Sequence, residues 1–283
     1  MPYQKCIDRS NPSLLLFLVD QSGSMENTIG GAGTRKQFVV DAISRTISTL
    51  VVNATRDDGG PRHYFDVGIL GYGNDNCGPG WGGQYATATV HPLPAIAQAS
   101  HTEKREKLSS DGLGGVFKTE VDFYTWVEPK ANGNTPMCAA LKQATAIVAE
   151  WSQGHQASFP ATVVHITDGE STDGDPSASA SALCETSTQD GNTLLFNIHI
   201  DSREGSEVLM PDSCEGLSSF ALTLYNMSSV VTDTMRSRAS DPASNLCRQL
   251  GPDARLFGYR CDAVGLSMLL DIGTPVAGIQ ADE

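Results

Sequence analysis

The 283-residue sequence lacks long hydrophobic runs and any excess of basic residues. The apolar run nearest its amino terminus, residues 14–19, is six residues long and ends at Asp20. A membrane-spanning helix needs about 20 apolar residues, and a signal peptide needs a longer apolar segment. The 19 Lys and Arg residues are outnumbered by 33 Asp and Glu, which gives a formal charge of −14. We therefore expect that the main partner is neither a nucleic acid nor an anionic membrane, since both attract basic surfaces.

Clustered cysteines are also absent. The seven cysteines form no C-x-x-C pair, and the two that are closest in sequence, Cys247 and Cys261, are 14 residues apart. This spacing argues against a zinc site and against thiol redox chemistry. An odd and scattered set favours reduced thiols in a cytosol over a disulfide framework. We therefore expect a soluble, cytoplasmic protein.

Several enzyme signatures are missing as well. Residues 30–36, GGAGTRK, lack the G-K-[ST] of a phosphate-binding loop, and the glycine-rich residues 71–83 do not open a helix as a dinucleotide-binding fingerprint does. No G-x-S-x-G sequence marks a hydrolase serine. His165 and His199 lie in predicted central strands, where a hydrogen-bonded structural histidine is the expected role. We predict no catalytic residue.

What is present is a regular alternation of strands and helices, with a hydrophobic content of 40% that is typical of a globular protein. Short apolar runs predict buried strands at 13–20, 64–73, 161–168 and 193–200, with a shorter strand at 255–260. Amphipathic segments predict helices at 35–54, 135–151, 176–189, 233–249 and 262–271.

This alternation predicts an α/β fold with a mostly parallel sheet and helices on both faces. The alternating residues 119–127 predict an edge strand, and residues 74–118 read as a loop-rich insertion. One domain over 14–271 is expected, between an N-terminal arm (1–13) and a C-terminal tail (272–283).

Oxygen-bearing side chains follow two of the predicted central strands. Asp20, Ser22 and Ser24 come at the end of the first strand, and Asp168 follows the strand at 161–168. Thr135 precedes a predicted helix. Because ligands of such sheets bind at the carboxyl ends of the strands, where the winding direction reverses, these three segments can meet there. Two carboxylates and three hydroxyls suit Mg²⁺ or Mn²⁺ better than Ca²⁺, and leave a coordination position for an external acid.

The sequences DQSGS (20–24), NTP (134–136) and TDG (167–169) together resemble the metal-ion-dependent adhesion site of von Willebrand factor A (VWA) domains. The resemblance covers about residues 14–270. It implies a Rossmann-like, doubly wound sheet with one antiparallel edge strand. It also implies that Ser22, Ser24 and either Thr135 or Asp168 bind the ion directly, while Asp20 acts largely through bound water.

The resemblance further implies a binding module in which a Glu or Asp of a partner protein completes the metal coordination. Intracellular bacterial proteins of this kind are often associated with serine/threonine kinases, PP2C-like phosphatases or AAA+ ATPases, in stress-response, signalling or defence complexes. Residues beside the site are candidates for partner contact: Gln21, Met25, Asn134, Glu170 and Trp81, the last as an exposed aromatic residue.

Two other functions remain open at this stage: a secreted or surface adhesion protein, and a Mg²⁺-dependent hydrolase or phosphatase. A phosphatase of the haloacid-dehalogenase type would need a second acid two residues after the first, where this chain has Ser22. The acids Glu170, Asp173 and Asp175 beyond the third motif are interpreted as solvated side chains. They could instead hold a second cation or repel unsuitable acidic partners.

Overall fold

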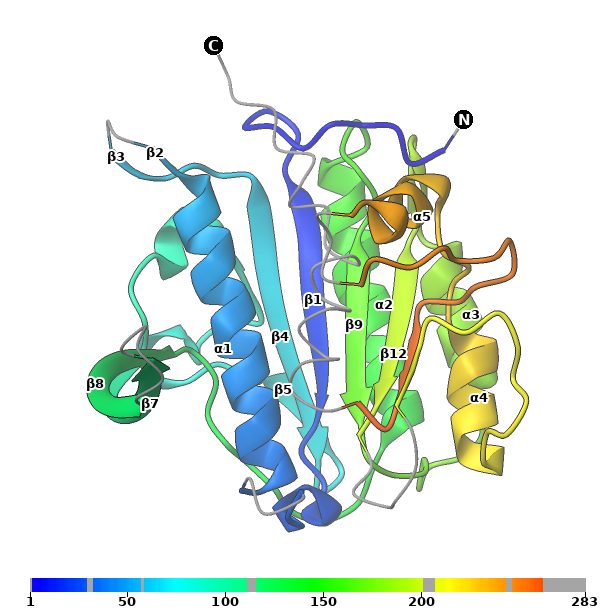
Figure 1. Cartoon of the computed structure of the whole chain (residues 1–283). Coiled ribbons are helices and arrows are strands. Elements are labelled where there is room, and N and C mark those ends of the chain that lie inside the picture. Colours follow the sequence, from blue (N-terminus) through cyan, green and yellow to red (C-terminus); the bar gives the residue numbers. More distant parts are fainter. Residues whose placement is uncertain are drawn as a thin grey trace.

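An eight-stranded sheet forms the centre of the computed structural model, which describes residues 2–29, 33–56, 59–110, 116–200, 207–242 and 246–261 (Figure 1). The predicted helix at 262–271 and the tail at 272–283 lie outside the described residues. The strand order is β13-β14-β12-β9-β1-β4-β5, and β6 also pairs with β4. The predicted α/β fold with a mostly parallel sheet is confirmed.

Five parallel strands occupy the middle of the sheet: β14 (Phe257–Tyr259), β12 (Leu194–His199), β9 (Thr162–Thr167), β1 (Ser13–Asp20) and β4 (Phe65–Gly73). Short antiparallel strands flank them at both edges: β13 (Val208–Leu209) on one side, and β5 (Asn76–Pro79) and β6 (Val90–Pro92) on the other. The expected antiparallel edge strand is therefore present, at each edge rather than at one.

Helices cover both faces of the sheet (Figure 1). On one face lie α1 (Arg35–Ala54) and α5 (Asp233–Ser240), and on the other lie α2 (Met137–Gly154), α3 (Ser177–Glu185) and α4 (Ser219–Met227). Residues of β1 alternate between the two cores, with Phe17 facing α1 and its neighbours Leu16 and Leu18 facing α2. The sheet is buried on both sides, which explains the continuous apolar runs of its central strands. No helix among the described residues is long and apolar enough to cross a membrane.

Helix α1 matches its predicted bounds, whereas the other helices differ. Helix α2 begins at Met137 rather than residue 135, because Pro136, at ψ 67°, is not yet helical. Helix α3 ends at Glu185, before the short strands β10 (Ser187–Thr188) and β11 (Gly191–Asn192), and α5 ends at Ser240. Helix α4 is absent from the sequence prediction. Other short elements are η1 (Gly23–Glu26), β2 (Thr55–Arg56), β3 (Gly59–Pro61), η2 (Gly83–Tyr85) and η3 (Leu93–Ile96).

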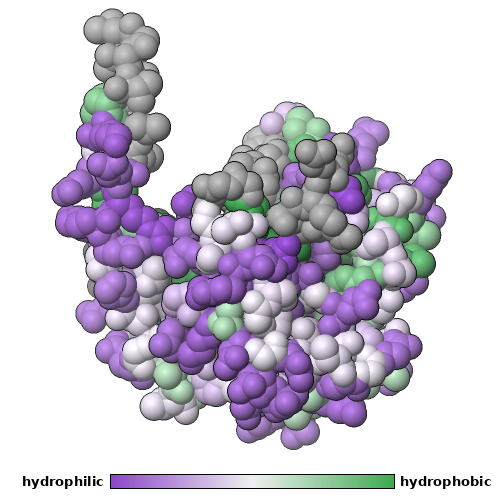
Figure 2. Space-filling view, turned by 90° about the horizontal axis from the view of Figure 1, so that it is seen from below, coloured by the Kyte–Doolittle hydropathy of each residue, from purple (hydrophilic) through white to green (hydrophobic). Residues whose placement is uncertain are grey.

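The predicted strand at 119–127 is present, but its predicted place at an edge of the main sheet is wrong. It forms β8 (Val116–Thr125), which pairs along its whole length with β7 (His101–Ser110) in a separate antiparallel hairpin. The hairpin is attached to α1 through an Arg105–Asp41 ion pair and through Phe123, whose ring centre lies 5.6 Å from the guanidinium of Arg45 in α1. Figure 2 shows it standing off the body as a mostly hydrophilic arm. Because β7 provides all of its strand pairing, β8 does not join the main sheet.

The order of the strands determines where a ligand site can form. The chain passes from β1 to β4 on one side and then returns to place β9 on the other side of β1. The winding direction therefore reverses between β1 and β9. Asp20 is the last residue of β1, and Asp168 directly follows β9. Both carboxylates therefore lie where the winding direction of the sheet reverses.

Candidate metal centre

Three segments that are distant in sequence meet at the carboxyl ends of β1 and β9. The turn after β1 is joined to the loop before α2 by a hydrogen bond from the Gly23 N–H to the Gly133 carbonyl, 2.9 Å. The same loop is joined to the segment after β9 by the Thr172 N–H, which donates to the Thr135 carbonyl at 2.9 Å. These main-chain bonds hold all three oxygen-bearing segments together.

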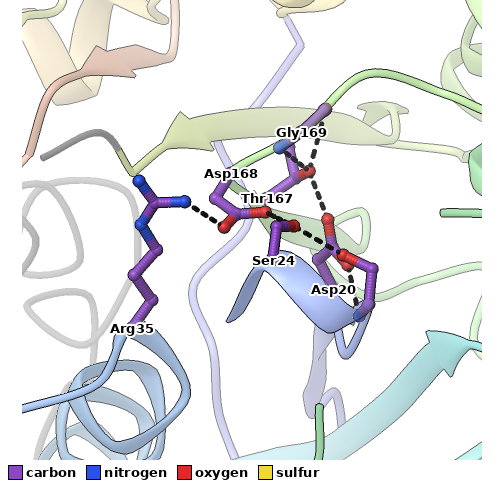
Figure 3. Close-up of polar contacts among 7 residues, drawn as sticks. Asp20, Ser24, Arg35, Thr167, Asp168 and Gly169 are labelled. Carbon is purple, nitrogen blue, oxygen red and sulfur yellow. Dashed lines mark hydrogen bonds and ion pairs between the residues drawn. The ribbon is translucent and has the colours of Figure 1, made fainter. Parts of the chain in front are cut away.

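Hydroxyl groups from the first segment reach the acid of the third (Figure 3). The Ser24 Oγ donates to Asp168 Oδ1 at 2.6 Å, and the Ser22 Oγ lies 3.0 Å from the Ser24 Oγ. A serine hydroxyl has one hydrogen, so Ser22 is the donor in the second bond. The two serines and the acid thus form one continuous chain of oxygen atoms.

Asp20 lies beneath this chain, and only 1% of the residue is exposed. Its Oδ1 accepts the Ser22 N–H at 2.8 Å, and its Oδ2 accepts the Thr167 hydroxyl at 2.7 Å. Burial raises the pKa of Asp20 to about 6, although these hydrogen bonds act in the opposite direction. The ionised carboxylate is therefore poorly compensated by its present surroundings, and a nearby cation would favour it.

Thr135 brings its hydroxyl to the same place. A Cβ placed on Gly169 would lie 3.7 Å from Thr135 Oγ1 and also 3.7 Å from Ser24 Oγ. The two hydroxyls therefore border one small space, which is left open because residue 169 has no side chain. The predicted residues Asp20, Ser22, Ser24, Thr135 and Asp168 are together in the structure.

Arg35, which the sequence analysis did not assign to the site, is also here. It is the first residue of α1, and its guanidinium forms an ion pair with Asp168 Oδ2 (Figure 3). The Asp168 side chain has no exposed surface, and that of Arg35 is 11% exposed. One carboxylate oxygen of Asp168 thus accepts a hydrogen bond from a serine hydroxyl, and the other forms an ion pair with a buried guanidinium.

The donor set fits a hard divalent cation. Carboxylates and hydroxyls are the oxygen ligands that Mg²⁺ and Mn²⁺ accept, usually together with water. Among the described residues there is no group of three or more His, Cys, Asp and Glu side chains that could hold a metal ion. A site at Asp20 and Asp168 would therefore depend on its three hydroxyls, and this shortage of carboxylates suits Ca²⁺ less well.

The residues proposed to contact a partner differ in exposure. Gln21 is half-buried, and Asn134 and Glu170 are exposed. Met25 and Trp81 have no exposed surface. The expectation that Trp81 is an exposed contact is wrong, because its indole packs in the α1 core and its N–H donates to the Thr89 carbonyl at 2.8 Å. Met25 likewise points into this core and offers no contact surface.

Asp173 and Asp175, beyond the third motif, have a structural role, whereas Glu170 is exposed as expected of a solvated side chain. Asp173 accepts the main-chain N–H groups of Cys138 and Ala139, both at 2.9 Å, in the first turn of α2. Burial raises the pKa of Asp173, but these hydrogen bonds outweigh it and lower the pKa overall. Asp175 accepts the Ser177 N–H at 2.9 Å, where α3 begins. Two of the three acids therefore satisfy helix amino termini, as capping residues do.

A buried histidine lies behind the site. Asn197 uses its Nδ2 to donate to Ser228 Oγ at 3.0 Å, so its Oδ1 accepts from His165 Nδ1 at 2.8 Å. With Nδ1 protonated, His165 Nε2 accepts from the Tyr72 hydroxyl at 2.7 Å. Burial lowers the pKa of His165 to about 4. The predicted structural role of this histidine is confirmed.

Acid is expected to destabilise the protein through His165. The folded-state pKa of about 4 lies below the value near 6.5 of an unfolded chain, so the unfolded state binds the proton first. The stabilisation is complete above about pH 6.5 and falls by up to about 3 kcal/mol as the pH approaches 4. Urea denaturation of wild type and His165→Gln across this range measures the difference.

The matched control is His101→Gln, at an exposed position of β7. This variant should keep the full pH dependence of the wild type, whereas His165→Gln should lose the part that belongs to the buried ring. An equal pH dependence in wild type and His165→Gln would show that His165 does not resist protonation.

Comparisons with known proteins identify no family for this chain. No family model matches, and no curated protein matches. Among solved structures, proximal thread matrix protein 1 of the mussel byssus is 14% identical with a TM-score of 0.44, over 78% of this chain and 42% of its own. The pilus adhesin SpaC of Lactobacillus rhamnosus GG is 14% identical with a TM-score of 0.47, over 92% of this chain and 30% of its own. The chain thus spans less than half of either protein, and likenesses this weak carry no argument.

Proposed function

We propose that this protein is a VWA-type binding module that holds Mg²⁺ or Mn²⁺ and docks an acidic side chain of a partner protein. The observation that carries the proposal is the convergence of hydroxyls and carboxylates from three distant segments around Asp168. The Ser24–Asp168 hydrogen bond of 2.6 Å and the shared position of Thr135 beside Gly169 support it. The doubly wound VWA arrangement is part of the same proposal.

The charges of the site favour an external carboxylate. Asp20 and Asp168 are the acids of the cluster, and the Arg35 guanidinium already neutralises one of them. A divalent ion held there would keep a net positive charge and an incomplete shell of protein ligands. A glutamate or aspartate of a partner protein is the group that would best complete it. The site would act by binding, without a bond-making step of its own.

Ser22 argues against the phosphatase alternative. A haloacid-dehalogenase type of mechanism needs a general acid at this position, and the Ser22 hydroxyl instead hydrogen-bonds to Ser24. Protein kinases, phosphatases and AAA+ ATPases of the same cytoplasm are candidate partners under this proposal. The formal charge of −14 disfavours nucleic acids and anionic membranes.

The proposal is tested in two steps with purified protein. Titration calorimetry should show Mg²⁺ or Mn²⁺ binding that Ser22→Ala weakens and that Ser10→Ala, at an exposed serine of the N-terminal arm, leaves unchanged. A pool of synthetic heptapeptides with a central glutamate should then bind in Mg²⁺ but not in EDTA. The pool with central glutamine should not bind. Metal-dependent hydrolysis of phosphoesters by the pure protein would instead support an enzyme.

Removing the charge of Arg35 is expected to strengthen metal binding. The guanidinium competes with a metal ion for Asp168 and adds a like charge beside it, so Arg35→Gln should raise the Mg²⁺ affinity on the order of tenfold. Calorimetry measures the change. Arg45→Gln is the control, since it removes the same charge from the same helix but at its contact with Phe123. Weaker Mg²⁺ binding by Arg35→Gln would show that Arg35 positions Asp168 for the ion.

A further inference from the structure

A cavity of about 270 Å³ lies directly beside the proposed metal centre. Its walls are the turn after β1, the β4–β5 turn and the loop before α2. The residues that line it are Gln21, Gly71, Gly73, Asn74, Asn76, Cys77, Gly78, Pro79, Lys130 and Asn132. None of the proposed metal ligands is among them, so this cavity is a separate feature of the same end of the sheet.

Glycines form part of the cavity floor, and one of them, Gly78, is uncovered. Gly71 pairs with Gly78 across β4 and β5, and residues paired in this way point to the same face. A Cβ on Gly71 would lie 2.3 Å from Gln21 Oε1, so the Gln21 side chain lies over Gly71 on that face. A Cβ on Gly78 would meet nothing within 4 Å. The backbone of β5 is therefore open to a ligand, as glycines in strands often permit.

The rim of the cavity is made of carboxamides. Gln21, Asn74, Asn76 and Asn132 each carry an amide group, which has both donors and an acceptor. Asn74 and its neighbour Asp75 adopt positive φ values of 48° and 59°, the backbone of a tight hairpin turn. Lys130 adds one ammonium group. Figure 2, which looks onto this end of the molecule, shows mostly hydrophilic and neutral surface among the described residues.

The cavity and the metal centre share their supports. Gln21 follows Asp20 directly, and its carbonyl accepts the Asn132 N–H at 2.7 Å. Two residues after Gln21, the Gly23 N–H donates in turn to the carbonyl of Gly133, which follows Asn132. A segment of a partner protein whose acid reaches the proposed metal centre can therefore continue across the neighbouring cavity.

We propose that this cavity binds the extended main chain of the partner beside the acid that reaches the metal. The inference rests on the proposed function and adds the shape of the partner: an acidic residue in an extended segment, rather than on a helix. Carboxamides match the N–H and C=O groups of a peptide, and the open position at Gly78 lets a backbone approach closely. The volume is slightly below that of pockets for drug-sized ligands, and suits a short stretch of chain.

The test fills the cavity without touching the metal centre. In Gly78→Leu the new side chain enters open space, and Gly154→Leu is the control because that glycine, at the end of α2, is equally open. The probe is the heptapeptide pool with central glutamate, in Mg²⁺. We expect Gly78→Leu to weaken peptide binding about tenfold, because the loss of one or two hydrogen bonds has an effect of this size. Gly154→Leu should have no effect on peptide binding. Asn132→Ala, at an exposed loop position, should weaken binding in the same direction.

A second arm separates main-chain from side-chain recognition. Peptides N-methylated at the residues flanking the glutamate keep their side chains but lose the N–H donors, and they should bind wild type about tenfold more weakly. They should show little further loss with Gly78→Leu, in which those contacts are already gone. Binding that needs Mg²⁺ but ignores Gly78→Leu and N-methylation would overturn this inference alone. A wild-type protein that binds no peptide in Mg²⁺ would overturn the proposed function as well.

Discussion

Addition of Mg²⁺ to the metal-free protein is expected to raise its free energy of unfolding by about 4 kcal/mol when the free ion exceeds its Kd about a thousandfold. The ion should bind only the folded state, because its ligands come from segments that are 144 residues apart in sequence between Ser24 and Asp168. It would also compensate Asp20, whose carboxylate is buried. Urea denaturation measures the gain, and the melting temperature should rise by roughly 2–4 °C for each kcal/mol.

Asp168→Asn should abolish most of this stabilisation, since it removes one of the two carboxylates of the site. Asp122→Asn is the matched control, because Asp122 pairs with Lys104 on the β7–β8 hairpin. It should keep the full stabilisation by Mg²⁺. An equal gain in wild type and Asp168→Asn would assign the effect to general ion binding. No gain with Mg²⁺, Mn²⁺ or Ca²⁺ would contradict the proposed metal site.

The strands could be predicted because they depend on local sequence, and the meeting of Asp20 and Asp168 follows from where parallel strands end. Eight consecutive buried residues of β1 end in an acid, and this pattern alone indicates a central parallel strand with a polar end. Parallel strands have their carboxyl ends at the same end of the sheet, so Asp20 and Asp168 are expected to lie close together there. The hydrogen bond between Ser24 and Asp168 shows how close the segments come.

Arg35 was missed because nothing in the residues around it indicates a charge partner. It begins α1, and the helix that follows β1 must start at the carboxyl end of that strand, which is where the site lies. This topological rule would have placed Arg35 near Asp168. The ion pair itself depends on the conformation of a long side chain, and the sequence carries no signal for that.

Helix α4 was missed although its sequence carries two signals. Ser218 caps the helix by accepting the Ala221 N–H, and Ala221, Leu224 and Tyr225 form a buried stripe at helical spacing. The hairpin of β7 and β8 is a different case. The alternating residues 119–127 predict the strand β8, but β7 lies in the segment that reads as a loop-rich insertion, so that reading is wrong for residues 101–110. Whether a strand joins the main sheet depends on long-range pairing that the pattern does not contain.

Trp81 is the clearest error, and it leads to a prediction of large effect. A tryptophan among glycines suggested an exposed loop. The strands before and after it in sequence, β5 and β6, both pair with β4 and hold Trp81 in the core. Trp81→Ala should lower the free energy of unfolding by about 3–5 kcal/mol, because it empties a buried site beside Tyr85 and His91. Urea denaturation measures the loss.

Trp81→Phe separates packing from hydrogen bonding at this position. The phenyl ring keeps much of the buried apolar surface, so the loss should be smaller than in Trp81→Ala. The lost hydrogen bond to the Thr89 carbonyl should account for about 0.5–1.5 kcal/mol of it, because that carbonyl still accepts the Ile69 N–H at 3.0 Å. Both variants should still bind Mg²⁺ under conditions in which they are folded, since the indole touches none of the proposed ligands. A stability of Trp81→Ala within about 0.5 kcal/mol of wild type would instead be the behaviour of a surface residue, and would return Trp81 to the role of a partner contact.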